Sequence, residues 1–196
     1  MRKHFLVGVF LAVFAAGIAA VVLLDARAPE PRSTPVAPLP GRPEIDLLAM
    51  VDPSRDAVKG TWTMENGRLV SDDGAASWLE LPVLLPEEYS FTLEFVPRAE
   101  AGTVQLLLFR GGKPFVCRIA TPDPGRVHTS TVEVRKDRVT VHLDNRQVAD
   151  WKAEVGDRQL RHEGVPGLGI SAGPVEFQKI RLFEVAGQGR RLWPPK

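Results

Sequence analysis

Apolar and polar residues alternate along several stretches of this chain, and that alternation constrains the fold most strongly. Phe91, Leu93 and Phe95 alternate with polar residues, and the same period of two recurs in residues 131–134 and 139–143. A period of two places apolar side chains on one face of a β-strand, whereas an amphipathic helix needs them every three or four positions. The pattern therefore predicts antiparallel strands that bury one face and expose the other.

Short turn signals separate these strands. The dipeptides Asn66-Gly67 and Gly111-Gly112 accept positive φ at both positions, as tight hairpins require. Residues 103–110 are apolar at both parities, which is typical of a strand covered on each side. The second hairpin signal comes directly after this strand, so it predicts that the chain reverses there and pairs with itself.

The remaining pattern completes a mostly β assignment. Residues 45–51 form a short apolar entry with one helical turn, and the apolar parity shifts between Phe177 and Ile180, which predicts a β-bulge. We expect about ten antiparallel strands in two packed sheets. The predicted strands are residues 61–64, 68–71, 77–83, 90–96, 103–110, 115–119, 131–134, 139–143, 147–151, 167–173 and 175–185.

Residues 5–24 are twenty apolar residues without a charge. A helix of that length spans roughly the 30 Å hydrocarbon core of a bilayer. Arg2 and Lys3 precede the run, and a basic flank stays on the cytoplasmic side. Two interpretations stay open: residues 1–28 are an uncleaved signal anchor in the inner membrane, or a signal peptide cleaved at an A-x-A-like site at residues 26–28. Either one places the following domain in the periplasm or outside the cell.

The segment after the apolar run is rich in proline. Six prolines lie within residues 29–43, and proline fixes φ and favours an extended chain. We interpret residues 29–44 as a linker that acts as a spacer. Residues 45–187 then form one β-domain that is long enough to bury a core, and residues 188–196 form a basic tail.

Charge and cysteine content narrow the function classes. Residues 1–43 hold five of the 25 basic and two of the 24 acidic residues, which leaves 20 basic and 22 acidic residues, a net charge of −2, downstream. That balance gives no electrostatic basis for nucleic-acid binding. Cys117 is the single cysteine and cannot form an internal disulfide. Its place in a predicted strand indicates a buried, unreactive thiol.

The order of strands and turns resembles a known group. The segment from Val132 to Trp151, which runs strand, charged turn, strand, turn and strand, resembles a unit of the concanavalin A-like jelly rolls, in particular their laminin G-like and 3-keto-disaccharide hydrolase-like branches. Residues 167–182 are similar to the closing strands of that group, and the hairpin from Trp62 to Leu69 is similar to its opening. The resemblance covers residues 45–187 and suits bacterial envelope proteins of the planctomycete type.

The resemblance implies an antiparallel two-sheet jelly-roll sandwich, a fold that carries lectins, glycosidases and adhesion modules. Catalytic members of the glucanase branch carry Glu-x-Asp-x-Glu on one strand, a motif that this chain lacks. Glu94 and Glu133 are the weak catalytic candidates, because both are expected on the outward side of their strands and glycoside hydrolysis uses two carboxylates.

Aromatic and hairpin residues supply the binding candidates. Trp62, Trp78 and Trp151 are candidate ligand-binding residues because sugars stack on indole rings, although core or sheet-edge packing is the simpler interpretation of each tryptophan. Asp144 and Asn145 are weak candidates for Ca²⁺, which prefers oxygen ligands; the simpler interpretation is a turn that hydrogen-bonds to backbone. No pattern calls for a cofactor.

Three functions remain open on these grounds. The leading hypothesis is a membrane-tethered, extracytoplasmic, non-catalytic β-sandwich that binds a glycan or an envelope protein. The first alternative is a glycoside hydrolase-like enzyme that acts on disaccharides, including 3-keto-disaccharides, and it follows from the resemblance alone. The second alternative is a structural module of an envelope complex.

Overall fold

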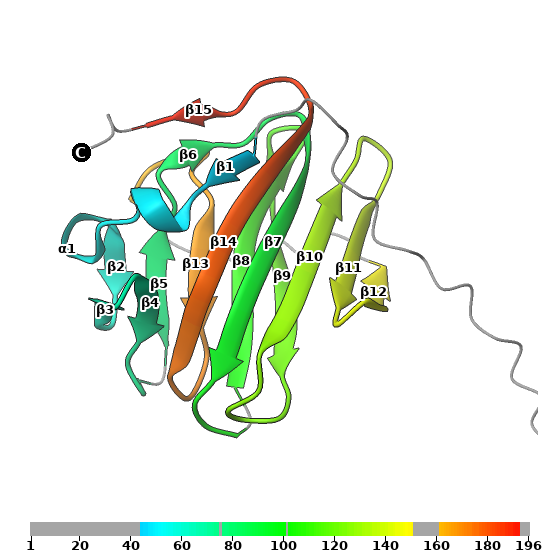
Figure 1. Ribbon diagram of the computed structural model, residues 1–196. Coiled ribbons are helices and arrows are strands. Elements are labelled where there is room, and N and C mark those ends of the chain that lie inside the picture. The colour runs from blue at the N-terminus through cyan, green and yellow to red at the C-terminus, as the bar shows by residue number, and fades with distance from the viewer. Residues whose placement is uncertain (1–43, 75, 101, 151–160, 193–196) are drawn as a thin grey trace, which may run out of the picture. The chain divides into compact units, whose positions relative to one another are not determined.

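Two antiparallel sheets pack face to face in the part of the chain that the computed structural model describes, residues 44–74, 76–100, 102–150 and 161–192 (Figure 1). Sheet A has eight strands in the order β12-β11-β10-β7-β14-β4-β3, with β1 paired to β14, and sheet B has the order β2-β5-β13-β8-β9. The strands of sheet A are β1 (Glu44–Asp46), β3 (Trp62–Glu65), β4 (Arg68–Ser71), β7 (Glu88–Pro97), β10 (His128–Val134), β11 (Val139–Leu143), β12 (Arg146–Asp150) and β14 (Val175–Ala186).

Sheet B lies behind sheet A in the view of Figure 1. Its strands are β2 (Ala57–Lys59), β5 (Ser77–Glu80), β8 (Gly102–Arg110), β9 (Lys113–Thr121) and β13 (Gly167–Ile170). The edge strand β9 is nine residues long and pairs on one side with β8. A separate two-stranded ribbon joins β6 (Val83–Leu84) to β15 (Arg190–Arg191).

The core lies between the two sheets and follows the predicted period of two. Along β7, Phe91, Leu93 and Phe95 are fully buried, and along β8 Val104 and Leu106 are as well. Burial of each such side chain is worth about 1.5–3 kcal/mol. The mostly β, antiparallel sandwich expected from the sequence is therefore confirmed.

The hairpin turns confirm the dipeptide signals. Asn66 and Gly67 have φ of 51° and 77°, and Gly111 and Gly112 have φ of 55° and 75°. Positive φ at both central residues gives the turn a twist that matches its two strands. The turn between β11 and β12 has the same form, with φ of 49° and 63° at its two central residues.

The predicted β-bulge is present in β14. Its register against β7 shifts between Phe177 and Lys179. The extra residue lets both Phe177 and Ile180 point into the core, where each is fully buried. The pairing of β10 with β11 also follows the predicted inward valines, with Val132 opposite Val141.

The structure differs from the sequence-based expectation at its short elements. The expected helical turn is the 3₁₀ helix η1 (Leu48–Met50), but the four-residue helix α1 (Pro53–Asp56) was not anticipated. Asp52 caps α1 by accepting a hydrogen bond from Ser54 N, and proline occupies the first helical position, which are the ordinary signals for a helix start.

The described residues also contain more strands than the roughly ten that the pattern predicted. The additional strands β1, β2, β6 and β15 are two or three residues long. The single predicted strand at residues 77–83 is two strands, β5 and β6, with Pro82 between them. Such short segments hold too few residues to show a period. A longer strand pairs with β1 and with β2, whereas β6 and β15 pair with each other.

No helix in the described residues, which begin at Glu44, is long and apolar enough to span a membrane. The predicted apolar helix at residues 5–24 and the proline-rich segment 29–43 lie outside the described residues.

Candidate functional site

A single row of five residues crosses the outer face of sheet B from one edge to the other. The strand register pairs Lys59 with Trp78, Trp78 with Gly169, Gly169 with Gln105, and Gln105 with Arg118. Directly paired residues in an antiparallel sheet share a face. With neighbouring strands about 4.8 Å apart, the row is about 19 Å long.

The chain neighbours of this row fix its orientation. Leu79, Leu168, Ile170, Val104 and Cys117 lie next to row residues in sequence and belong to the core between the sheets. Because successive side chains of a strand point to opposite faces, the row faces away from sheet A. This surface is called the B face below, and the opposite surface, on sheet A, is called the A face.

Trp78 lies with the face of its indole ring against Gly169. A Cβ atom on Gly169 would lie 2.6, 2.7 and 2.8 Å from Trp78 Cε2, Cζ2 and Cδ2. Three nearly equal distances to fused ring atoms place the glycine over the ring plane rather than at its edge. Trp78 itself is half-buried. The missing side chain at residue 169 therefore lets the indole spread flat across β13, on the sheet's surface.

Gln105 carries an unsatisfied acceptor next to this ring. The residue is 7% exposed, and its Oε1 is buried without a hydrogen-bond partner in the described residues. A buried polar atom without a partner costs about 1–3 kcal/mol. Thr121 Oγ1 and His142 Nδ1 share this state, but Thr121 has the inward parity of β9 and His142 lies on the A face. Gln105 alone of the three lies in the row with the tryptophan.

The two ends of the row are cationic. Lys59 at the β2 edge and Arg118 at the β9 edge are both exposed, and neither forms an ion pair with another described residue. Lys59 lies beside Trp78, and Arg118 lies beside Gln105. The row thus combines an aromatic surface, an acceptor and two positive charges.

The outward residues of the B face beyond Trp78 are buried. Leu107 and Val116 are 5% and 3% exposed there. The carboxylate of Glu80, which is 6% exposed, accepts a hydrogen bond from His162 N at 2.9 Å and contacts His162 Nδ1 at 2.7 Å. Both carboxylate oxygens are therefore engaged within the domain. Toward the other end, Thr103 is half-buried and Ala120 is exposed.

The structure places Trp62 differently from Trp78. Trp62 is 5% exposed and belongs to the core, with its ring centroid 6.3 Å from that of Phe177. Its Nε1 donates a hydrogen bond to Lys59 O at 3.3 Å. This contact joins β3 to the end of β2, and it gives Trp62 a packing role. Trp151, the third tryptophan predicted to bind a ligand, lies outside the described residues.

Glu94 and Glu133 share the A face but lie far apart on it. Glu94 forms an ion pair with Lys179, with 3.0 Å between Oε1 and Nζ. Glu133 is 7% exposed and lies opposite Ser90 on β7. Ser90 and Glu94 are four positions apart on one strand, which is about 13 Å, whereas paired glycosidase carboxylates lie about 5–9.5 Å apart.

Asp144 and Asn145 form the turn between β11 and β12. Asp144 Oδ1 accepts a hydrogen bond from Thr129 N at 2.9 Å, and Oδ2 contacts His128 Nδ1 at 2.8 Å. Burial favours the neutral acid, but these two contacts and the charge of Arg126 outweigh it and hold the pKa of Asp144 below its ordinary value. Asp144 thus ties the turn to β10. The described residues contain no group of three or more His, Cys, Asp or Glu side chains that could hold a metal ion.

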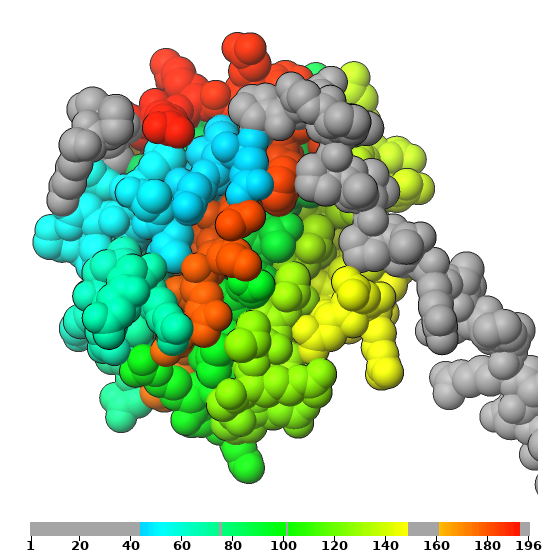
Figure 2. Space-filling view, viewed as in Figure 1, coloured from blue at the N-terminus to red at the C-terminus, as the bar shows by residue number. Residues whose placement is uncertain are grey.

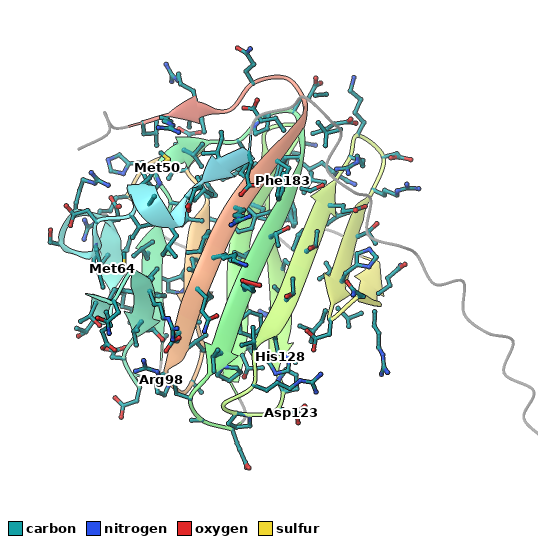
Figure 3. All side chains as sticks on the ribbon, viewed as in Figure 1. Met50, Met64, Arg98, Asp123, His128 and Phe183 are labelled. Carbon is teal, nitrogen blue, oxygen red and sulfur yellow. The ribbon has the colours of Figure 1, made fainter. Side chains whose placement is uncertain are left out.

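His128 lies at the lower end of β10 in Figure 3, next to Asp123. Its side chain is 1% exposed and packs against Phe95, with 5.8 Å between the ring centroids. The predicted buried thiol is also confirmed: Cys117 is 1% exposed, and burial raises the pKa of its thiol to about 12.

Comparison with known proteins identifies the fold. A putative glycosyl hydrolase from Parabacteroides distasonis superposes on this structure with a TM-score of 0.51 and 9% identity, covering 74% of this chain and 100% of that chain. The carbohydrate-binding module CBM66 from Bacillus subtilis gives a TM-score of 0.49 at 18% identity, with 65% of this chain and 94% of that chain covered. A Bacillus subtilis protein with a galectin-like fold gives 0.48 at 12% identity, with 76% and 96% covered. The fold is a concanavalin A-like jelly roll.

The resemblance to the concanavalin A-like jelly rolls expected from the sequence is thus confirmed at the level of the fold. No protein-family model matches the chain, and no curated protein matches it. Identities this low show a shared fold alone, and a fold of this kind hosts many functions. The function of this jelly roll has to be argued from its own side chains.

One of the five row residues could be predicted as a ligand-binding residue from the sequence, and four could not. Trp78 was predicted to bind a ligand, but Lys59, Gly169, Gln105 and Arg118 were not singled out. Gln105 and Arg118 each carried a signal: a polar side chain at an outward position in an otherwise apolar strand. Gly169 carried no such signal, because the role of a glycine within a strand depends on which side chain packs against it, and here that side chain is Trp78 from the neighbouring strand.

Proposed function

We propose that this domain binds a glycan on the B face. One observation carries the proposal: the Trp78 indole lies flat on Gly169, in line with a buried Gln105 Oε1 that has no donor. A sugar ring offers an apolar CH face to an aromatic ring and hydroxyl donors around its rim. A ring stacked over Trp78 would bury its CH face on the indole, and its hydroxyl groups would point along the row, where Gln105 would have to turn its buried amide outward to accept from them.

Binding is favoured over hydrolysis by the carboxylates available. Glycoside hydrolysis uses two carboxyl groups on either side of the scissile bond. The described strands of the B face offer one, Glu80, and both of its oxygens are engaged by His162. A glycoside hydrolase-like activity stays an alternative, and release of reducing sugar by the purified protein would favour it. A structural role in an envelope complex is the second alternative, and a stable protein partner without any glycan ligand would favour it.

We further propose that the domain works outside the cytoplasm. The support is the sequence: an apolar run at residues 5–24 behind a basic flank, followed by the proline-rich spacer at residues 29–43. As a signal anchor the run would tether the domain to the inner membrane, and as a cleaved signal it would release it. Accessibility of the domain to protease added outside intact spheroplasts tests this; full protection would contradict it.

The glycan proposal is tested with the full chain in detergent on a broad glycan array, followed by calorimetry on each hit. Trp78→Ala should weaken binding by about tenfold or more, which corresponds to about 1.4 kcal/mol. Phe183→Ala is the matched control, because Phe183 is a half-buried aromatic residue on the A face (Figure 3). Equal losses in the two variants, or no hit from the folded protein, would contradict the proposal.

A further inference from the structure

The exposed charged side chains at the two ends of the row on the B face are both positive. Lys59 and Arg118 stand exposed at the two ends of the row, without ion-pair partners among the described residues. The described strands of this face carry one carboxylate, Glu80, and His162 engages it. A ligand on this face therefore meets two positive charges and no free negative charge from the described strands.

The cations that lie next to β14 on the A face are paired, unlike those at the two ends of the row. On the A face Arg68 contacts Glu176 at 2.5 Å, Lys179 contacts Glu94, and Arg181 contacts Glu44 at 2.7 Å. Figure 2 shows this face, with the orange strand β14 between the cyan N-terminal elements and the green strands β7 and β10. The cations that face solvent over β14 have acidic partners within reach, whereas those of the B face have none in the described strands.

The position of Arg118 suits it to bind a planar anion such as a carboxylate. It lies on the strand next to Gln105, about 5 Å away across the sheet, and about 14 Å from Trp78, three strands away. The guanidinium group presents parallel N–H donors that match the two oxygens of a carboxylate, and it is charged at every physiological pH. A chain of sugar rings that begins on Trp78 and passes Gln105 would bring its next substituent to Arg118.

We infer that the B face selects an acidic glycan, with a uronic-acid carboxylate bound by the Arg118 guanidinium while another ring of the same oligosaccharide stacks on Trp78. This inference rests on the proposed glycan-binding function and specifies its ligand class. Lys59, beside Trp78, adds positive charge at the other end of the row and favours a glycan with more than one acidic ring. The charges attract such a chain, and stacking on the Trp78 ring together with the Arg118 contact gives it a fixed direction along the row.

The experiment measures affinity of the full chain in detergent for oligogalacturonate and for oligomers of alginate, each beside its carboxyl-reduced, neutral counterpart. The acidic form should bind about tenfold or more tightly than the neutral form, and the preference should shrink as salt screens the charges. Arg118→Gln should remove most of the preference, measured as the ratio of the affinities for the acidic and the neutral form. Arg138→Gln is the matched control, because Arg138 is an exposed arginine in the turn between β10 and β11.

The outcomes separate the two proposals. Equal binding of acidic and neutral forms, with Trp78→Ala still harmful, would overturn the acidic preference and keep the glycan proposal. An equal loss in Arg118→Gln and Arg138→Gln would overturn it as well, because it would show a general charge effect. Equally tight binding of dextran sulfate that also depends on Arg118 would overturn the selectivity for carboxylate. Binding of no glycan at all would overturn both proposals.

Discussion

The two outer faces of this jelly roll use polar side chains in opposite ways. On the A face Glu176 accepts hydrogen bonds from Arg68 and Arg98, at 2.5 and 2.9 Å. These bonds connect β14 to β4 and to the end of β7. On the B face Arg118 and Gln105 Oε1 have no such partners in the described residues. The comparison teaches that charges paired within the domain support the fold, whereas the exposed cations in line with the Trp78 ring are available to a ligand.

The largest effect that tests this comparison is expected from the two tryptophans. Trp62→Ala should lower the free energy of unfolding by about 3–5 kcal/mol, because it empties a core site, whereas Trp78→Ala should cost clearly less because Trp78 is half-buried. Urea unfolding followed by circular dichroism measures both. Similar losses of stability would remove the distinction between a core tryptophan and a surface tryptophan.

The contact between Gly169 and Trp78 should give the next largest effect. Gly169→Ala places a methyl group within 2.6 Å of the indole, and overpacking of this kind costs about 1–3 kcal/mol. The displaced ring should also weaken glycan binding. In the double variant with Trp78→Ala the three ring atoms nearest to the methyl group are gone, so most of the loss of stability should disappear. A full loss in the double variant would show that the cost arises from the β13 backbone.

A smaller effect is expected from acid on the A face. The hydrogen bond from Arg98, with further contacts from Gln178 and Arg68, holds the pKa of Glu176 below its ordinary value despite its burial. A carboxylate with a lowered folded-state pKa adds stability above its unfolded-state pKa and loses it as the pH falls through the folded-state pKa. Glu176→Gln should therefore cost about 1 kcal/mol at neutral pH and less in acid.

Thermal unfolding of wild type and Glu176→Gln across that pH range measures the difference. Glu100→Gln is the control, because Glu100 is an exposed carboxylate beyond β7 and its removal should change stability little at any pH. A difference between wild type and Glu176→Gln that stays constant from neutral to acid pH would show that the carboxylate charge does not stabilise the A face.

The smallest effect concerns Cys117, on the inner side of β9. Its thiol is buried and its pKa is raised to about 12, so the reactive thiolate is scarce at neutral pH. A disulfide reagent added to the native protein should label it slowly, and labelling should become complete within mixing time in denaturant. Fast labelling of the folded protein would indicate that β9 opens from the edge of sheet B.

The strands, turns and bulge that could be predicted from the sequence are those specified by a pattern within a short segment of the chain. Phe91, Leu93 and Phe95 alternate, Asn66-Gly67 closes a hairpin, and the parity shift after Phe177 marks the bulge. Each of these signals lies within a few residues of the feature it specifies, because period and turn geometry are properties of a short segment. Local signals also identified Trp78 as a candidate.

The row on the B face could not be assembled from the sequence in this way. Trp78 and Gln105 become neighbours only because β13, which carries Gly169, inserts between β5 and β8. That insertion depends on a strand that follows much later in the chain, so it is a property of the topology. The same limit applies to Trp62 and Trp78, which look alike in sequence and differ in which side of their strands is covered.

The position of Arg118 has a consequence for self-association. The long edge strand β9 has unpaired backbone groups in the described part of the chain, and such an edge invites another copy of the same strand. Pro114 lacks the N–H that such pairing needs, and Lys113 and Arg118 place positive charges on both sides of the edge. Crowded copies of this domain therefore repel one another along β9, and the residues that keep them apart include the one that we assign to the ligand.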